Sequence, residues 1–279
     1  MPLVPTGEII AAGPVCAFNV ITLEHAEAIV AGAESAGSRV ILQISENAVR
    51  FHNGRLGPIA AAARAVAEAA TVDVALHLDH VVSPELWRQA HEHGFGSIMV
   101  DASRLLYQDN VATTRAAAEF AHARGLWVEA ELGTVGGKED DPPIDPHAPG
   151  SRTDPKQAAS YVEQTGVDAL AVAVGSSHAM TTRDAALDHP LIAKLRDAVP
   201  VPLVLHGSSG VPDEELRRAV TGGIVKVNIG TALNISYTDA VRSCLAAQPS
   251  VVDPRRYLTR ARDAMAATVA HFCRLLATS

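Results

Sequence analysis

The sequence is poor in aromatic residues and in cysteine. Phe, Trp and Tyr make up only 4% of the 279 residues, although 48% are hydrophobic, so Ala, Val, Leu and Ile must supply most of the core. The three cysteines, Cys16, Cys244 and Cys273, form no CxxC pair. Their number and spacing favour a reducing compartment and exclude a thiolate zinc site. A chain of this length can bury a full core as one large domain.

Clusters of positive charge and long apolar runs are also absent. The net charge is −8 and Lys and Arg are scattered, which argues against nucleic acid and against an anionic membrane surface as partners. No apolar run reaches the roughly 20 residues that span a bilayer. The N-terminus lacks the basic region and apolar stretch of a signal peptide. We therefore expect a soluble, cytoplasmic protein.

Short apolar runs alternate along the chain with longer Ala-, Glu- and Arg-rich segments of helical character. The runs span residues 15–18, 39–43, 74–79, 96–101, 126–132, 168–174, 202–206 and 224–228. Near-continuous apolar strands between helices predict a parallel sheet that is covered on both faces. Eight such strands favour a closed (β/α)8 TIM barrel over an open doubly wound sheet. Because no linker interrupts the pattern, residues 1–279 are expected to form a single domain.

Two of the predicted helices have clear ends, and one connection is unusually long. Ser83-Pro84 predicts the start of a helix that runs to Gly94, and Asp154-Pro155 predicts one that runs to Gly166. Residues 133–152 are rich in Gly, Pro and Asp and show no periodicity. A loop of that length is typical either of a functional lid or of a disordered surface insertion.

Ionisable side chains gather at the C-terminal ends of the predicted strands, where barrel enzymes carry their active sites. His80 follows the third strand, His178 follows the sixth, and His206 ends the seventh. A single histidine would more often be a hydrogen-bonded core residue, but three at different strand ends favour a metal site. Three histidines with one open position are a known ligand set of catalytic zinc. The carboxylates at the same rim are Asp79, Asp101, Glu129 and Glu131.

Two Gly-rich stretches follow the last two strands. HGSSG (206–210) and NIGTA (228–232) offer hydroxyl groups and accessible backbone N–H groups. The loops after strands seven and eight form the usual phosphate site of this barrel, so the pair predicts a phosphorylated substrate.

The series of motifs resembles the class II, metal-dependent ketose-bisphosphate aldolases, which include fructose-1,6-bisphosphate and tagatose-1,6-bisphosphate aldolases. The matching motifs cover nearly the whole chain in order: AFN (17–19), ISENA (44–48), LHLDH (76–80), MVDAS (99–103), VEAELGTVGGKEDD (128–141), AVAVGSSHAM (171–180), PLVLHGSSG (202–210), VKVNIGTAL (225–233) and DPRRYL (253–258). The chain length is similar to that of the shorter, tagatose-type branch.

The resemblance implies a lyase of carbohydrate metabolism that reversibly cleaves a ketose 1,6-bisphosphate to dihydroxyacetone phosphate and glyceraldehyde 3-phosphate. It implies that His80, His178 and His206 bind Zn²⁺ and that Glu131 is an acidic neighbour able to approach the metal. Cleavage of the C3–C4 bond leaves negative charge at C3 that must spread onto the C2 oxygen, and zinc can polarise that carbonyl group. Asp79 would be the acid/base at the C4 hydroxyl.

The remaining roles also come from the resemblance. Glu139, on the long loop, would be the acid/base at C3 of dihydroxyacetone phosphate. Arg255 would reach the distal phosphate in a neighbouring subunit of a homodimer or homotetramer. A monovalent cation, Na⁺ or K⁺, would lie near the triose phosphate. The expected substrate contacts are Asn19, Ser45, Ala179, Gly207, Ser208, Ser209, Asn228, Ile229, Gly230 and Thr231.

Two positions depart from the family pattern. Ala179 follows the second zinc histidine where the family usually has glycine, and its methyl group is expected to crowd the phosphate or the monovalent ion, or to forbid positive φ. Val81 stands where many members have a second histidine. The choice among fructose bisphosphate, tagatose bisphosphate and another phosphorylated ketose therefore stays open.

Three other functions compete with this interpretation. A Schiff-base aldolase could use Lys226, but a charge partner in or near the barrel interior is the simpler interpretation of that residue. A zinc hydrolase would not need two phosphate loops. A non-catalytic sugar-phosphate sensor would not need an intact Asp79.

Overall fold

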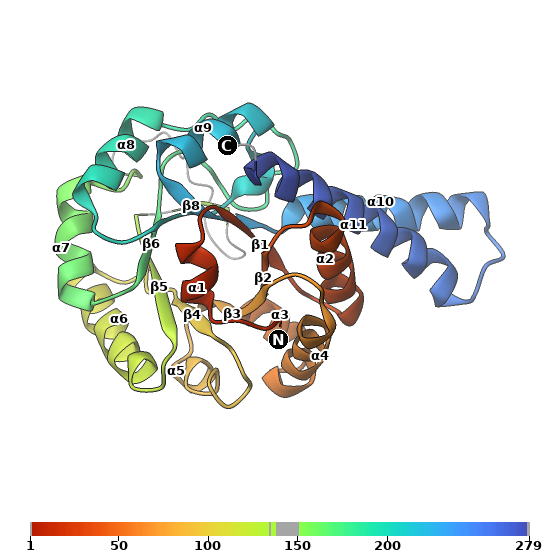
Figure 1. The fold of residues 1–279 in the computed structure, drawn as a ribbon, viewed down its shortest axis with the longest axis horizontal. Coiled ribbons are helices and arrows are strands. Elements are labelled where there is room, and N and C mark those ends of the chain that lie inside the picture. Colours follow the sequence, from red (N-terminus) through yellow and green to blue (C-terminus); the bar gives the residue numbers. More distant parts are fainter. Residues whose placement is uncertain (1, 134, 138–150, 278–279) are drawn as a thin grey trace.

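Eight parallel strands close into a barrel in the order in which they follow one another along the chain (Figure 1). The computed structural model describes residues 2–133, 135–137 and 151–277. The strands are β1 (Val15–Asn19), β2 (Val40–Ser45), β3 (Val74–Val81), β4 (Ser97–Val100), β5 (Trp127–Leu132), β6 (Ala169–Val172), β7 (Leu203–Leu205) and β8 (Ile224–Ile229). Each overlaps one of the predicted apolar runs, and the predicted (β/α)8 barrel is confirmed.

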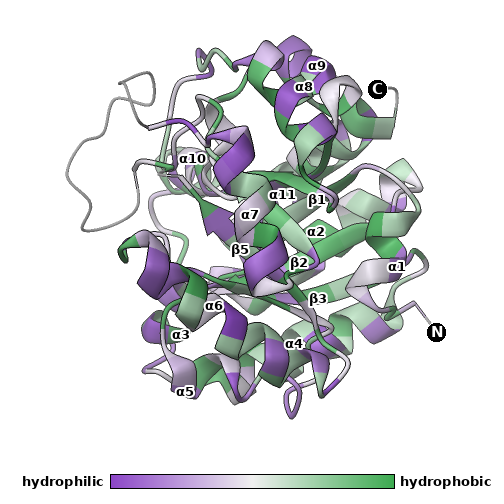
Figure 2. Ribbon diagram, turned by 90° about the vertical axis from the view of Figure 1, so that its left-hand side faces the viewer, coloured by the Kyte–Doolittle hydropathy of each residue, from purple (hydrophilic) through white to green (hydrophobic). Residues whose placement is uncertain are grey.

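Helices surround the barrel, and their inner faces pack on strands that are hydrophobic along most of their length (Figure 2). They are α1 (Thr6–Ala11), α2 (Leu23–Ala36), α3 (Glu46–Phe51), α4 (Leu56–Ala69), α5 (Pro84–Trp87), α6 (Tyr107–His122), α7 (Pro155–Thr165), α8 (His189–Ala198), the 3₁₀ turn η1 (Ser208–Gly210), α9 (Asp213–Gly222), α10 (Thr231–Ala247) and α11 (Pro254–Ala277). Among the described residues, no helix is long and apolar enough to cross a membrane.

One of the two predicted helix ranges is confirmed and the other is too long. The Asp154 carboxylate accepts a hydrogen bond from the Gln157 N–H at 2.8 Å, and Gly166 ends α7 at φ 70°. Helix α5 begins at Ser83 as predicted but ends at Trp87 rather than at Gly94. After Trp87, several backbone N–H groups bond to carbonyls three residues back, which produces a series of turns instead of an α-helix.

The N-terminal end of the barrel is closed by α1, which lies across it in Figure 1. Ile9 and Ile10 of this helix pack against Val15, Ile41 and Ala75 from the barrel interior. The opposite end, where the strands finish, is left for the functional side chains.

The last two helices form an arm. Helix α11 packs against α2 and α10, and the outer ends of α10 and α11 extend beyond the barrel (Figure 1). Of the α10 residues, only Leu233 is fully buried. Most of α10 therefore contributes to the surface of the protein rather than to its core.

Candidate active site

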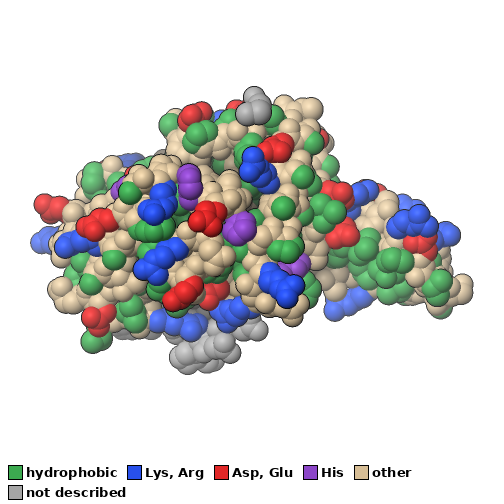
Figure 3. All heavy atoms as spheres, turned by 90° about the horizontal axis from the view of Figure 1, so that it is seen from below, with side chains coloured by type: hydrophobic (Ala, Val, Ile, Leu, Met, Phe, Trp, Pro, Cys, Tyr) green, Lys and Arg blue, Asp and Glu red, His purple; other side chains and the backbone are tan. Residues whose placement is uncertain are grey.

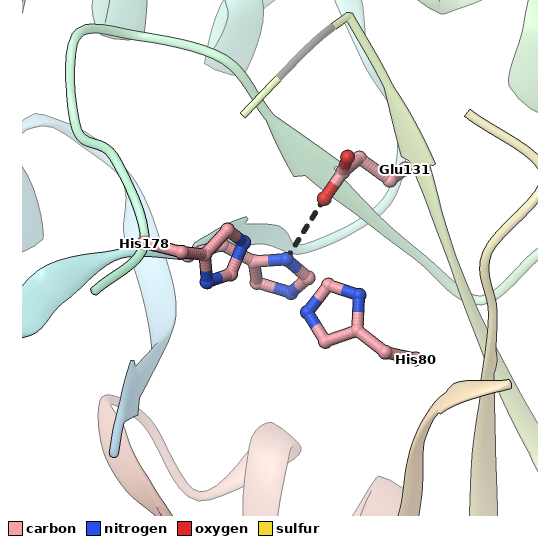
Figure 4. Close-up of side chains that lie close together, drawn as sticks. His80, Glu131 and His178 are labelled. Atoms are coloured by element: carbon pink, nitrogen blue, oxygen red, sulfur yellow. Dashed lines mark hydrogen bonds and ion pairs between the residues drawn. The ribbon is translucent and has the colours of Figure 1, made fainter. Parts of the chain in front are cut away.

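Three imidazole rings meet at the C-terminal end of the barrel, as predicted. His80 comes from β3, His178 from the segment after β6, and His206 directly follows β7; their ring centroids lie 4.7, 5.1 and 5.7 Å apart. Glu131 of β5 joins them, and one ligand atom of each residue lies within 4.8 Å of the others. Figure 4 shows the side chains of His80, His178 and Glu131 pointing toward one another.

His80 is held in an uncommon backbone conformation. Its φ is 47°, in the left-handed region, and the pairing of β3 with β4 is irregular between Leu78 and Val81. Asp101, at the end of β4, lies 2.8 Å from the Nδ1 atom of His80. This hydrogen bond orients the ring and leaves Nε2 as the nitrogen for a ligand. Strain of this kind concentrates at functional sites.

His206 is buried between two carboxylates. Its Nε2 lies 2.9 Å from Glu129 Oε1, and its Nδ1 lies 3.0 Å from Glu131 Oε2. Burial alone lowers the pKa of His206, but the hydrogen bonds to Glu129 and Glu131 outweigh burial and raise this pKa to about 9. A metal ion that binds this ring must therefore displace a proton.

A second buried charge cluster lies deeper in the barrel. Lys226 of β8 donates to Glu129 Oε2 at 2.6 Å, and both side chains are fully buried. Burial raises the pKa of Glu129, but the Lys226 ammonium, His206 and His77 more than reverse this effect and lower the pKa well below its usual range. Burial and the same ammonium lower the pKa of His77 to about 3, so its ring is neutral.

The donor atoms and the formal charges of the site fit a divalent cation. Asp79, Glu129 and Glu131 are three buried carboxylates, whereas Lys226 is the one buried ammonium among the described residues. With the imidazoles counted as neutral, two formal negative charges remain, which a divalent ion would balance; without the ion, the proton favoured by the raised pKa of His206 offsets one of them. Three histidines and a carboxylate are also a nitrogen and oxygen donor set suited to zinc.

Asp79 lies beside this ligand set with an unused acceptor. Its Oδ1 atom is buried and hydrogen-bonds to no described residue; His77 Nε2 is 3.8 Å away. The same holds for both amide atoms of Asn228, at the end of β8. Buried polar atoms without partners are costly, and both residues line a cavity, so these atoms are available to a bound ligand.

The cavity has a volume of about 610 Å³ and reaches both Gly-rich loops. Of the predicted site residues, the following line it: Asn19, Ser45, Asp79, His80, His178, Ala179, Gly207, Ser209, Asn228, Gly230 and Thr231. Ser208 and Ile229 are buried and do not line it. The Ser208 hydroxyl instead donates to the Leu205 carbonyl at 3.0 Å.

The two Gly-rich loops are joined at the cavity. The Ala232 N–H, in the first turn of α10, donates to Ser209 Oγ at 3.0 Å. The start of this 17-residue helix therefore faces the same space as the loop after β7. A helix N-terminus and a glycine-rich turn together present the N–H groups and positive dipole end that suit an anion.

Ala179 corrects one sequence-based expectation. Of the expected effects of its methyl group, which were crowding of the phosphate or the monovalent ion or exclusion of positive φ, the last does not occur, because Ala179 has a φ of 56°. Its backbone thus keeps the conformation that glycine adopts at lower cost. Val81, the other departure, is fully buried in β3, away from the cavity lining.

Comparisons with known proteins agree with this geometry. The family model for class II fructose-bisphosphate aldolases matches residues 12–279. The chain belongs to this family. It is 42% identical over 257 residues to the fructose-bisphosphate aldolase of Geobacillus stearothermophilus, which covers 90% of this chain and 87% of that protein.

Other aldolases resemble the chain over similar lengths. The fructose-bisphosphate aldolase of Staphylococcus aureus strain Mu50 is 39% identical over 253 residues, 90% of this chain and 87% of the relative. The crystal structure of the YdjI aldolase of Escherichia coli K12 superposes with a TM-score of 0.83 at 32% identity, covering 97% of this chain and 94% of the other. Membership of the family makes this protein an aldolase, and therefore a lyase.

His206, Glu131 and Arg255 are predicted site residues of this aldolase that do not line the cavity. Arg255 begins the second helix of the arm, 88% exposed, and its guanidinium pairs with Asp253 at 2.7 Å. It does not line the cavity of its own chain. Glu139 lies outside the described residues, as does most of the long loop over residues 133–152.

Sequence reasoning missed several residues at the cavity. Gln43 lines it and donates to Asn19 Oδ1 at 3.0 Å, which orients that amide. A glutamine inside the apolar run VILQIS was the available signal. The cavity is also lined by Arg50, Phe51, Val82, Arg104 and Leu105, which carry no such signal in the sequence.

Proposed function

We propose that this aldolase reversibly cleaves a ketose 1,6-bisphosphate, with fructose 1,6-bisphosphate as the first substrate to test, into dihydroxyacetone phosphate and glyceraldehyde 3-phosphate. The observation that carries the proposal is one cavity that combines His80, His178, the free Oδ1 of Asp79 and residues of both Gly-rich loops. An aldol cleavage of a phosphorylated ketose needs each of these parts. The relatives' names favour fructose over tagatose as the substrate.

His80, His178 and His206 would hold Zn²⁺, with Glu131 close enough to approach it. When bound, the ion would act as a Lewis acid on the C2 carbonyl oxygen, where negative charge develops as the C3–C4 bond breaks. Support comes from the ligand atoms of these four residues, which lie within 4.8 Å of one another, and from the excess of buried carboxylates over the buried ammonium.

Asp79 would take the proton of the C4 hydroxyl while the aldehyde leaves, and would return it in the condensation direction. Its buried Oδ1 is adjacent in sequence to a proposed ligand and has no described hydrogen-bond partner. Glu139 remains the proposed acid/base at C3, on the resemblance alone.

The phosphate of the triose portion would bind at the two Gly-rich loops, near Gly207, Ser209 and the start of α10, with a monovalent cation, Na⁺ or K⁺, close by. Local N–H groups can bind this anion even though the net charge of the chain is −8, because the field at a site is set by nearby dipoles. Ser208 and Ile229 are buried and do not line the cavity, so they would contribute by packing behind the residues that do.

A second copy of the chain would supply Arg255 for the distal phosphate, in a homodimer or homotetramer. The arm supports this proposal because it exposes hydrophobic side chains as well as arginines (Figure 3). Val252 near its tip is 90% exposed, and Ile235 and Leu245 are 37% and 39% exposed. The cysteines are all free thiols, which agrees with a cytoplasmic location.

A Schiff-base mechanism through Lys226 has little support. The ammonium is fully buried, ion-paired with Glu129 at 2.6 Å, and absent from the cavity lining. Borohydride in the presence of dihydroxyacetone phosphate should therefore leave the enzyme active and unlabelled.

The decisive test is steady-state cleavage by zinc-loaded protein of fructose and tagatose 1,6-bisphosphates, which differ only in C4 configuration. We expect turnover that a chelator abolishes and that added Zn²⁺ restores. Tight binding of both bisphosphates without cleavage would support the sensor function and overturn the proposal. Hydrolysis of a phosphate or acyl group in place of aldol cleavage would support the zinc hydrolase.

A further inference from the structure

A continuous set of hydrogen bonds connects the buried ammonium to the proposed metal ligands. Lys226 Nζ contacts Glu129 Oε2 at 2.6 Å, and Glu129 Oε1 contacts His206 Nε2 at 2.9 Å. The other nitrogen of the same ring, Nδ1, contacts Glu131 Oε2 at 3.0 Å. Lys226, Glu129, His206 and Glu131 are all fully shielded from solvent.

The two carboxylates that flank His206 are not equivalent. Glu131 belongs to the group whose ligand atoms lie within 4.8 Å of one another, whereas Glu129 does not belong to it. The Nδ1 side of the ring contacts the carboxylate that belongs to this group, and the Nε2 side contacts the carboxylate that is paired with Lys226. A metal-binding histidine typically donates its second N–H to a carboxylate, which fixes the tautomer and the orientation of the ring.

We propose that Glu129, fixed by Lys226, is a positioning residue that accepts the Nε2–H of His206 and directs Nδ1 of that ring to the metal. The inference rests on the proposed function, because it assigns a support to its metal site. It also gives the buried lysine a role that differs from Schiff-base chemistry.

The Lys226 ammonium is suited to fixing the Glu129 carboxylate because an ammonium can only donate hydrogen bonds. A fully buried carboxylate without a cation would be costly, and Lys226 supplies the opposite charge within hydrogen-bond distance. Since Lys226 occupies Oε2, the remaining oxygen of Glu129 is left as an acceptor for His206.

The far side of Lys226 is supported by a separate polar set. Lys226 Nζ lies 3.4 Å from His77 Nε2, His77 Nδ1 lies 2.7 Å from Ser97 Oγ, and Ser97 Oγ lies 2.6 Å from Thr6 Oγ1 of α1. None of these hydrogen bonds involves His206. The set therefore provides a control that removes buried hydrogen bonds without altering the acceptor of the ligand.

Two double variants separate the acceptor from the charge. In E129L/K226M the buried ion pair becomes apolar and His206 Nε2–H loses its acceptor, while no unpaired charge is left behind. In E129Q/K226M the pair is also uncharged, but the side-chain carbonyl introduced at position 129 can still accept from His206. The new amide group would face His77 Nε2, which is 3.9 Å from the replaced oxygen.

The measurement is the zinc dissociation constant of folded apoprotein, by competition with a chromophoric chelator, alongside circular dichroism and urea midpoints. We expect E129L/K226M to weaken zinc binding by about 10–100-fold, the usual cost of losing such a partner. E129Q/K226M should stay within about tenfold of the wild type, because it keeps the acceptor. The control Ser97→Ala should lose stability but not zinc affinity. Wild-type affinity in E129L/K226M would overturn the proposal.

A second measurement needs no variant. In ¹⁵N-labelled, zinc-loaded wild-type protein, long-range proton–nitrogen correlations should show His206 protonated at Nε2 and metal-bound at Nδ1. Coordination through Nε2 would overturn the proposal even if the double variants fail to fold. If wild-type protein binds no zinc, the proposed function itself fails, and that outcome is distinct from zinc binding that is indifferent to Glu129.

Discussion

At the scale of single residues, Asp79 and His80 are neighbours in β3 that have different proposed roles. The ring of His80 is oriented by Asp101 at 2.8 Å, whereas Oδ1 of Asp79 is left without a described hydrogen-bond partner. The irregular pairing between Leu78 and Val81 and the positive φ of His80 let consecutive side chains point toward the same cavity. In a regular strand they would face opposite sides.

We expect Asp79→Asn to lower the cleavage rate by about 10²–10⁴-fold, the usual range for losing a general acid or base. Zinc content should not change, because Asp79 is not part of the His and Glu group. Steady-state kinetics with metal analysis of the same samples checks both points. Near-normal cleavage at unchanged zinc content would remove Asp79 from the proposed mechanism.

Ala179→Gly tests the strained backbone at φ 56°. Glycine adopts this conformation without a steric penalty, so we expect a gain of about 1 kcal/mol in the free energy of unfolding, seen as a higher urea midpoint. Ala61→Gly in α4 is the matched control, because the same change in an exposed helical position should cost about 1 kcal/mol. An equal loss of unfolding free energy in Ala179→Gly and Ala61→Gly would contradict the interpretation that the backbone of Ala179 is strained.

The sequence allowed the three histidines, Asp79 and both Gly-rich loops to be placed at one end of the barrel, because each lies at or just after the end of an apolar run. It did not reveal backbone conformation, so the positive φ of His80 and Ala179 was not foreseen. The contacts that link His206 to Glu129 and Glu129 to Lys226 were also not predicted. Glu129 and Lys226 come from β5 and β8, and only closure of the barrel brings them together.

At the scale of elements, the strands were easier to predict than the ends of the helices. A buried strand carries its own signal in a run of apolar residues, whereas the length of a helix depends on hydrogen bonds that compete at its end. The segment after Ser83 illustrates this, since its cap is correct but the N–H groups of Gln89, Ala90 and Gly94 bond to carbonyls three residues back. Glycine at position 94 marked the end of the turns rather than the end of the helix.

Asp213 connects three elements near the site. At the start of α9 it pairs with Arg183 from the segment after β6 at 2.5 Å and with His271 of α11 at 2.9 Å. Burial raises the pKa of Asp213, but the hydrogen bonds from Arg183 and His271 outweigh it and lower this pKa below its ordinary value. A carboxylate with a lowered pKa stabilises the fold above its unfolded pKa and loses this contribution as the pH falls.

Asp213→Asn should therefore be less stable than the wild type at pH 7, by about 1 kcal/mol or less because the carboxylate is partly exposed. The difference should shrink as the pH falls below the unfolded pKa of about 3.9 and disappear below the folded pKa. Urea titrations from neutral to strongly acidic pH measure this. Asp197→Asn, at a carboxylate that is 69% exposed, is the control and should show no difference. If Asp213→Asn were as strongly destabilised at strongly acidic pH as at pH 7, the lowered pKa of Asp213 could not be the cause.

At the scale of the whole molecule, we propose that the barrel and the arm contribute different parts of the active site. The barrel brings two of the proposed ligands, His80 and His178, to one cavity of about 610 Å³ with Asp79 and residues of both Gly-rich loops. The arm places Arg255 at its exposed outer part, where a neighbouring copy can reach it, and leaves hydrophobic side chains uncovered beside it. If Arg255 binds the distal phosphate as proposed, it must do so in a second chain, because it does not line the cavity of its own chain.

A mixing experiment tests this shared site. Asp79→Asn and Arg255→Ala should each be nearly inactive alone, whereas Arg242→Ala, at another exposed arginine of the arm, should be active. Unfolding and refolding the two inactive variants together creates hybrids in which one site combines an intact Asp79 with an intact Arg255. In a two-fold dimer with random mixing, about a quarter of all sites would recover. Full activity of Arg255→Ala alone, or an inactive mixture in which native mass spectrometry detects the hybrids, would show that each chain completes its own site.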